Sequence, residues 1–401
     1  MPYEKLYTSL QVFIAMNPDR LLIYGAAFTI MGLSNAIIPI LPELANQSNT
    51  QGEFISSLLF SAYFLGALST MLPFGILADK YGTIKFLSLG IILTAVAGLI
   101  ILSLENIWVL LISRFIEGLA CGAFFPAAFA ALSEFKNPGR YIGEFTFLFN
   151  AGLASGALLS GLLADRYLKG AIFVFTLMSL ILTFYLFLRY REFILPHKKQ
   201  KPGQFSIFPE ILIRAPFKEI IRLFNHSDSR IWISSFLLNG AIGILIAYYP
   251  NYSIGILSKA QLGSAIASLY VCAMITSLFA GRFDVKEDTL IKIGIVFSAF
   301  GALSAIKYPF LGFSSLGGGS GIATVGFAVV ASRINADRGL VMGFLNTTIY
   351  AGLSFVPVVA GLFTGILSFE ELFIANGIIL AGALLLKNKE NRKDVSPEAF
   401  A

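Results

Sequence analysis

The sequence predicts an all-α integral membrane protein whose twelve transmembrane helices form two pseudo-symmetric six-helix bundles. Of the 401 residues, 56% are hydrophobic and 13% are charged. The mean hydropathy is +0.78, which implies more apolar surface than one water-soluble core could bury. The apolar residues fall into long runs, and none of these runs alternates between apolar and polar residues. Helices are therefore the structure that satisfies the backbone in lipid.

Twelve apolar runs are each long enough to cross about 30 Å of hydrocarbon as a helix. They cover approximately residues 21–43, 53–77, 84–104, 107–132, 141–165, 170–189, 231–256, 261–281, 289–306, 309–332, 338–364 and 371–386. The polar connections divide the chain into a cytoplasmic N-terminal segment (1–20), a first bundle (21–189), a cytoplasmic linker (190–230), a second bundle (231–386) and a cytoplasmic tail (387–401).

The Lys and Arg residues predict the orientation in the membrane. With the N-terminus inside, 24 of the 29 basic residues fall in cytoplasmic segments. The outer loops hold Arg166, Lys169, Lys259 and Lys307, and Arg114 alone lies deep within a span. Because basic residues concentrate on the cytoplasmic side, we expect a multi-pass protein of the cell membrane with both termini in the cytoplasm.

A first internal repeat relates the two bundles. Three glycines of the fifth span recur 200 residues later in the eleventh span, which pairs Gly143 with Gly343, Gly152 with Gly352 and Gly161 with Gly361. The tripeptide Ala-Gly-Leu around Gly152 also recurs around Gly352. This pattern is typical of two halves related by an axis along the membrane normal.

A second repeat lies within the first bundle. The segment Gly-Ile-Leu-Ala-Asp-Lys-Tyr at 75–81 recurs as Gly-Leu-Leu-Ala-Asp-Arg-Tyr at 161–167, at the opposite membrane face. An inverted repeat of three spans plus three predicts this arrangement. Under one hypothesis each copy latches one face, with Asp165 and Arg166 at the outer one. The alternative is a local ion pair of Asp165 with Arg166 or Lys169.

The turn between the second and third spans resembles a motif of the major facilitator superfamily of transporters, G-x-x-x-D-[RK]-x-G-[RK]-[RK]. Gly75, Asp79, Lys80 and Gly82 match the motif, and Lys85 stands one position beyond its basic pair. The resemblance implies that this turn braces the closed cytoplasmic side and releases when the halves rock. A glycine at position 82 also permits a tight turn.

The fourth span holds a charged pair, Arg114 and Glu117, followed by Gly118. The spacing resembles a second motif of the superfamily, R-x-x-x-G. Residues three apart share a helix face, and charges inside a span face inward or pair. One interpretation is that Glu117 carries a proton while Arg114 adjusts its affinity or contacts substrate. The other is a static internal salt bridge.

The fifth span resembles the antiporter motif of the same superfamily. Gly143, Gly152, Gly156 and Gly161 keep its spacing, whereas Ala157 replaces its proline, and Pro357 stands at the equivalent position of the eleventh span. The resemblance implies hinge and packing roles for these residues and for Gly343, Gly352 and Gly361. Small residues also occur simply where helices pack closely.

Neutral polar and aromatic side chains within the spans are candidates for a substrate cavity or for contacts between helices. The cavity candidates are Tyr63, Phe124, Asn150, Asn239, Tyr249, Asn346 and Tyr350. Spans seven to twelve contain no Asp or Glu between their ends, so a proton-carrying carboxylate deep in the bilayer must be Glu117.

Together these features favour a monomeric secondary transporter that exports hydrophobic or amphipathic small molecules in exchange for protons across the lipid bilayer. The alternatives are a transporter of a polar metabolite, sugar or organic anion, with Arg114 as the anion contact, and a non-transporting receptor or scaffold. No nucleotide loop, zinc spacing or catalytic triad occurs, so we expect no enzyme activity, cofactor, metal or nucleic acid.

Overall fold

The computed structural model describes residues 18–46, 53–135, 138–194, 229–282, 285–334 and 338–386, and these residues form helices and the turns between them. The predicted N-terminal segment to residue 17, the linker from 195 to 228 and the tail from 387 lie outside the described residues.

Each predicted span corresponds to a helical segment. The first half contains α2 (Pro18–Ala36), η1 (Ile38–Ile40), α3 (Leu41–Asn46), α4 (Glu53–Tyr81), α5 (Thr83–Ser103), α6 (Ile107–Ser133), α7 (Pro138–Leu163) and α8 (Gly170–Ile194). The second half contains α10 (Ser229–Tyr252), α11 (Lys259–Ala280), α12 (Glu287–Ser304), α13 (Pro309–Ser332), α14 (Arg338–Gly361), α15 (Phe369–Gly382) and η2 (Ala383–Leu385). Ten of the segments in the described residues are long and apolar enough to count as membrane spans by length and composition. Of the other two, α12 begins with Glu287 and Asp288, and α15 has 14 residues before η2.

The first span differs from the continuous helix that its hydropathy predicts. α2 ends at Ala36, and the chain then passes through the short 3₁₀ helix η1 into α3. Pro39 and Pro42 explain the interruption, because proline lacks the amide proton and its ring crowds the preceding turn of a helix.

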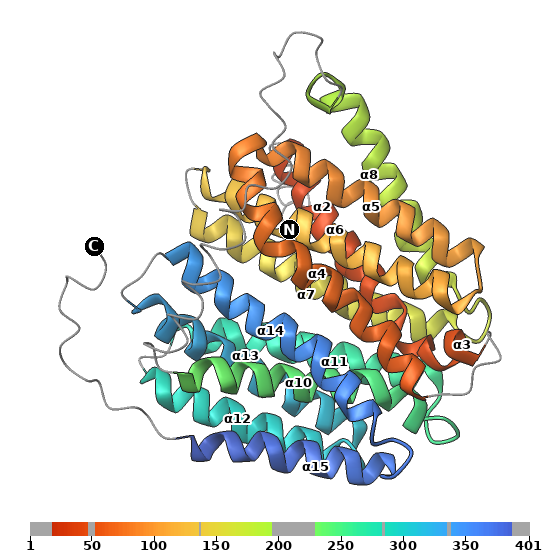
Figure 1. Cartoon of the computed structure of the whole chain (residues 1–401), viewed down its shortest axis with the longest axis vertical. Coiled ribbons are helices and arrows are strands. Elements are labelled where there is room, and N and C mark those ends of the chain that lie inside the picture. The colour runs from red at the N-terminus through yellow and green to blue at the C-terminus, as the bar shows by residue number, and fades with distance from the viewer. Residues whose placement is uncertain are drawn as a thin grey trace, which may run out of the picture.

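The helix contacts repeat between the halves (Figure 1). α4 packs on α6 as α11 packs on α13, α2 on α7 as α10 on α14, and α5 on α8 as α12 on α15. The contacts between the halves follow the same rule, because α4 meets α14 and α7 meets α11. These two seams are equivalent when each helix is exchanged for its counterpart. The prediction of two pseudo-symmetric six-helix bundles is therefore confirmed.

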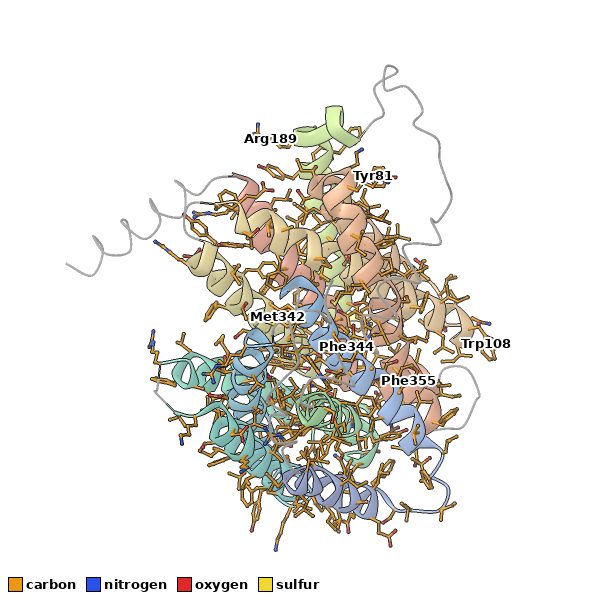
Figure 2. The ribbon with its side chains drawn as sticks, turned by 60° about the vertical axis from the view of Figure 1, so that its left-hand side comes forward. Tyr81, Trp108, Arg189, Met342, Phe344 and Phe355 are labelled. Atoms are coloured by element: carbon orange, nitrogen blue, oxygen red, sulfur yellow. The ribbon has the colours of Figure 1, made fainter. Side chains whose placement is uncertain are left out.

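The outer surface carries many exposed apolar side chains, which suits a surface covered by lipid. Four exposed aromatic residues with a polar group lie at helix ends rather than in helix centres: Tyr81, Trp108, Tyr167 and Tyr308. Figure 2 shows Tyr81 and Trp108 at different ends of the first half. Tyr and Trp are enriched at this level, where hydrocarbon meets the headgroups.

Candidate functional site

Close packing of α6 against α4 sets the position of the charged pair. A Cβ atom on Gly118 of α6 would lie 2.0 Å from the Tyr63 carbonyl oxygen, and one on Gly66 of α4 would lie 2.2 Å from the Phe115 carbonyl oxygen. The two backbones are therefore in contact, which glycine permits and a larger residue would prevent. This close contact explains why position 118, four residues after Arg114, is a glycine.

Arg114 is buried between the two helices, with 2% of its surface exposed. Its Nε donates a hydrogen bond to the Leu59 carbonyl oxygen of α4 at 3.2 Å. Its Nη1 donates to Glu117 Oε2. The guanidinium carbon also lies 4.9 Å from the centre of the Tyr63 ring, where the negative face of the ring attracts a cation. Three groups from two helices therefore hold Arg114 in place.

Glu117 is fully buried, and only one of its carboxylate oxygens is paired. Oε2 accepts from Arg114, whereas Oε1 has no hydrogen-bond partner in the described part of the chain. A buried polar atom of this kind is rare and costs free energy unless something satisfies it. An incoming hydrogen-bond donor would satisfy it, whereas protonation would remove the buried charge of the carboxylate. Both members of the pair are buried in this structure.

A contact that the sequence did not reveal joins this site to the second half. Cys121, one helical turn after Glu117, has its Sγ 3.7 Å from Tyr350 Oη of α14. The Tyr350 ring also lies 5.9 Å from the Phe64 ring of α4. The face of α6 that carries Glu117 therefore contacts the second half directly. Cys121 lies in an apolar run, so composition gave no signal for this role.

At the predicted outer end, a cross-half ion pair links α11 to α3. Lys259 Nζ lies 2.7 Å from Glu43 Oε1 and donates to the Pro39 carbonyl oxygen at 2.9 Å. Lys259 is the first residue of α11, where a positive charge opposes the helix dipole. The contact with Glu43 across the halves therefore explains why a lysine occupies this position. Its place as a basic residue in an outer loop was the one sequence signal.

Beside this ion pair the halves touch backbone to backbone. A Cβ atom on Gly161 of α7 would lie 2.3 Å from the Lys259 carbonyl oxygen, and one on Gly263 of α11 would lie 2.4 Å from the Ala157 carbonyl oxygen. Tyr270 of α11 donates to Asn35 Oδ1 of α2 at 3.2 Å. The α7–α11 seam is therefore tightly closed at its outer end.

The predicted outer latch has a different environment. Asp165 and Arg166 lie in the turn after α7 and are exposed. Neither makes an ion pair in the described residues. The described residues also show no local ion pair of Asp165 with Arg166 or Lys169. The ion pair at the outer end is instead formed by Glu43 and Lys259.

The second seam, between α4 and α14, also closes at the outer end. A Cβ atom on Gly361 would lie 2.6 Å from Phe54 Cδ2, and Ser354 Oγ donates to the Ser61 carbonyl oxygen at 3.5 Å. Pro357 interrupts the hydrogen-bond ladder of α14, and its carbonyl oxygen accepts from Tyr248 at 2.7 Å.

The remaining glycines of α7 and α14 differ in their surroundings. Cβ atoms on Gly152, Gly156 and Gly352 would lie 2.2–2.4 Å from carbonyl oxygens of α2 or α10, so these glycines allow close helix contact. Gly143 has nothing within 4 Å of that position, and Gly343 has only Leu72 at 3.9 Å.

The turn between α4 and α5 has the geometry that its sequence predicts. Gly82 has a φ of 98°, a conformation that favours glycine. Lys80 and Lys85 are exposed, and the Lys80 amine lies 5.4 Å from the Tyr81 ring centre. Gly75 packs against Pro126 of α6. The side chain of Asp79 lies outside the described part of the structure.

The cavity candidates separate into three groups. Phe124 and Tyr249 are fully buried inside the first and second half respectively, and Tyr249 donates to the Ala305 carbonyl oxygen at 2.7 Å. This environment favours packing over substrate contact for both. Asn150 and Asn239 are half-buried and donate to carbonyl oxygens of their own helices, whereas Asn346 is exposed. Tyr63 contacts Arg114 directly, and Tyr350 contacts Cys121, one helical turn after Glu117.

Comparison with known proteins agrees with this fold. The family model described as Major Facilitator Superfamily matches residues 23–283 and 231–400. An uncharacterized MFS-type transporter of Methanocaldococcus jannaschii is 25% identical over 373 residues, which cover 88% of this chain and 92% of that protein. The quinolone resistance protein NorA of Staphylococcus aureus is 24% identical over 408 residues, which cover 94% of this chain and 98% of that protein.

Among solved structures, that of the nucleoside transporter NupG superposes with a TM-score of 0.68 at 15% identity, covering 91% of this chain and 98% of that chain. At this identity the likeness concerns the fold alone. The symmetric halves, the three sequence motifs and the family match over most of the chain lead to one conclusion. The protein belongs to the major facilitator superfamily of transporters.

Proposed function

We propose that this transporter exports hydrophobic or amphipathic small molecules in exchange for protons, and that Glu117 is the proton site. The observation that carries the proposal is the buried Arg114–Glu117 pair with one unpartnered carboxylate oxygen. The similarity over nearly the whole chain to a protein named for quinolone resistance supports the direction and the substrate class.

The chemistry of the pair suits a coupling site. While Glu117 is ionised it neutralises Arg114. A proton on Oε1 leaves the guanidinium without an opposite charge in an apolar site, and such a charge is costly. Protonation therefore changes the relative free energies of the arrangements of α4 and α6. The contact of Cys121 with Tyr350 offers a route from this change to the second half.

The contacts between the halves support alternating access, with this structure as an inward-facing state. Both seams are closed at the predicted outer end by Lys259, Gly161 and Gly361. At the predicted cytoplasmic end Lys80 and Lys85 are exposed. Both features fit a state in which the turn between α4 and α5 has released, and the turn would brace that side in the outward-facing state.

Reconstitution into liposomes with an imposed pH gradient tests the proton site. In the Glu117→Gln variant we expect gradient-driven transport of a lipophilic dye cation to fall by about tenfold or more, while exchange of dye without a gradient persists. Glu134→Gln is the matched control, because Glu134 is an exposed carboxylate at the end of the same helix. Gradient-driven transport at the wild-type rate in Glu117→Gln would remove Glu117 as the proton site.

A second candidate follows from Arg114, the one basic residue deep within a predicted span. If the substrate is an organic anion or another polar metabolite, the guanidinium would contact it directly. The Arg114→Lys variant separates the candidates, because it would abolish anion uptake and only modulate dye export. Vesicles that show no flux of either substrate class would favour a receptor or scaffold.

The outer ion pair makes a separate prediction about the conformational equilibrium. Lys259→Met should open the outer end more often, because it removes a partly exposed ion pair worth about 1 kcal/mol, or roughly fivefold in population. Distances between spin labels at Glu105→Cys and Ile366→Cys, in outer loops of the two halves, would report the change. The charge swap Lys259→Glu with Glu43→Lys should restore the closed population, and Lys307→Met should leave it unchanged. An unchanged distance distribution in Lys259→Met would exclude a latch.

A further inference from the structure

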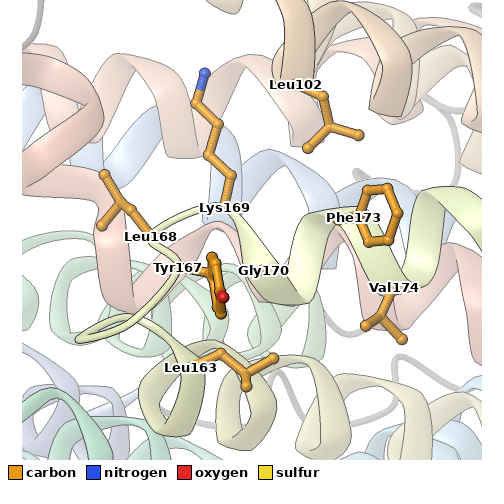
Figure 3. Close-up of a pocket in the computed structure, with 8 residues that line it drawn as sticks. All are labelled: Leu102, Leu163, Tyr167, Leu168, Lys169, Gly170, Phe173 and Val174. Atoms are coloured by element: carbon orange, nitrogen blue, oxygen red, sulfur yellow. The ribbon is translucent and has the colours of Figure 1, made fainter.

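A groove of about 600 Å³ lies at the predicted outer end of the first half, away from the charged pair. Its walls come from the end of α5, the end of α7, the turn between α7 and α8, and the start of α8 (Figure 3). Leu102, Leu163, Phe173 and Val174 make it predominantly apolar. The size is that of an ordinary small-molecule site, but the groove opens to the surface that lipid covers.

Lys169 is the one basic residue among those that line this apolar groove. Figure 3 shows the Lys169 side chain leaving the turn with its amine directed away from Leu163 and Tyr167. The side chain is half-buried and has no ion pair in the described residues. Burial lowers the pKa of the Lys169 amine, and the Glu105 carboxylate acts in the opposite direction. A partly desolvated ammonium without an ion-pair partner is costly and favours an anion beside it.

The other lysines of the outer loops have partners. Lys259 pairs with Glu43, and the Lys307 amine lies 5.9 Å from the Tyr308 ring centre. Lys169 has neither an ion pair nor a cation–ring contact in the described residues. The adjacent Tyr167 is 72% exposed, as expected for an aromatic side chain at the level of the lipid headgroups.

We propose that this groove binds a membrane phospholipid, with its phosphate at the Lys169 amine and an acyl chain along Leu163, Phe173 and Val174. The phosphate supplies a direct ion-pair partner, which Lys169 lacks among the described residues even though the Glu105 carboxylate acts on its amine. A lysine binds phosphate as a point charge. The apolar walls favour a ligand that has an acyl chain over a purely polar anion. The bilayer supplies the ligand at the depth where the groove opens.

Native mass spectrometry of the full chain in detergent tests the proposal, with dioleoyl phosphatidylglycerol and dioleoylglycerol as probes. These lipids share their acyl chains, and only the first has a phosphate. The wild-type protein should bind the phospholipid roughly tenfold more tightly, as expected for a hydrogen bond between charged groups. Lys169→Gln should lose this preference, whereas Lys307→Gln, at another outer lysine, should keep it.

A second variant tests the apolar part of the groove. Val174→Trp should weaken the binding of both lipids, because the indole fills space along α8 without touching the charge. Equal binding of the two lipids by the wild type, or an unchanged preference in Lys169→Gln, would overturn the proposal. So would competitive displacement of the phospholipid by a transported dye, because the groove would then belong to the transport path.

Discussion

Replacing Arg114 with Met should destabilise the protein by about 3–5 kcal/mol, because it leaves the buried Glu117 carboxylate without its partner. Arg114 also bonds to the Leu59 carbonyl oxygen, so the same change removes a link between α6 and α4. Unfolding in mixed micelles of increasing SDS content, followed by circular dichroism, measures the loss.

The control is an ion pair of similar sequence spacing at the surface. Arg140 and Glu144 are four residues apart at the start of α7, and their side chains are 68% and 34% exposed. Arg140→Met should cost no more than about 1 kcal/mol, the usual value for an exposed pair. Equal losses for Arg114→Met and Arg140→Met would contradict a special role for burial.

The double variant Arg114→Met with Glu117→Leu separates stability from transport. Replacing both members of a buried pair with apolar residues is often neutral or stabilising, so we expect most of the lost stability to return. Proton-driven transport should not return, because no ionisable group then remains at the site. If the double variant still uses the pH gradient to transport the dye against the dye's own concentration gradient, the pair is static and does not carry the proton.

The fold could be predicted from the sequence because hydropathy and charge are local properties of each segment of the chain. Each apolar run needs only its own composition to become a span, and the basic residues orient the spans one loop at a time. The same local logic predicted Arg114 and Glu117, since a spacing of three residues places both on one helix face. The broken first span was the local exception, and Pro39 and Pro42 were its signal.

Contacts between the halves could not be predicted in this way. Lys259 meets Glu43 across 216 residues of sequence, and Cys121 meets Tyr350 across 229. Such pairs depend on how two complete bundles meet, and no spacing rule encodes that. The repeat of 75–81 at 161–167 suggested a latch at Asp165, yet the residues in contact at the outer end are Gly161 and Lys259. Within this repeat it is Gly161, and not Asp165 or Arg166, that contacts the other half.

Gly118→Ala should both destabilise the protein and reduce transport, although it adds only one methyl group. That methyl would lie 2.0 Å from the Tyr63 carbonyl oxygen and 2.8 Å from the Ala67 amide nitrogen. Both are backbone atoms, so α6 has to move away from α4 as a unit. Overpacking of this kind costs about 1–3 kcal/mol. The shift would also stretch the hydrogen bond of Arg114 to Leu59, which ties this packing contact to the charged pair.

Gly143→Ala is the matched control, because the same methyl group meets nothing within 4 Å there. Alanine is the better helix former by about 0.5–1 kcal/mol, so this variant should be neutral or slightly more stable. The two variants have the same chemistry and differ in whether the glycine touches another backbone. If Gly118→Ala unfolds at the wild-type SDS content and transports normally, α4 and α6 do not hold the charged pair by backbone contact, and the position of Arg114 must have another cause.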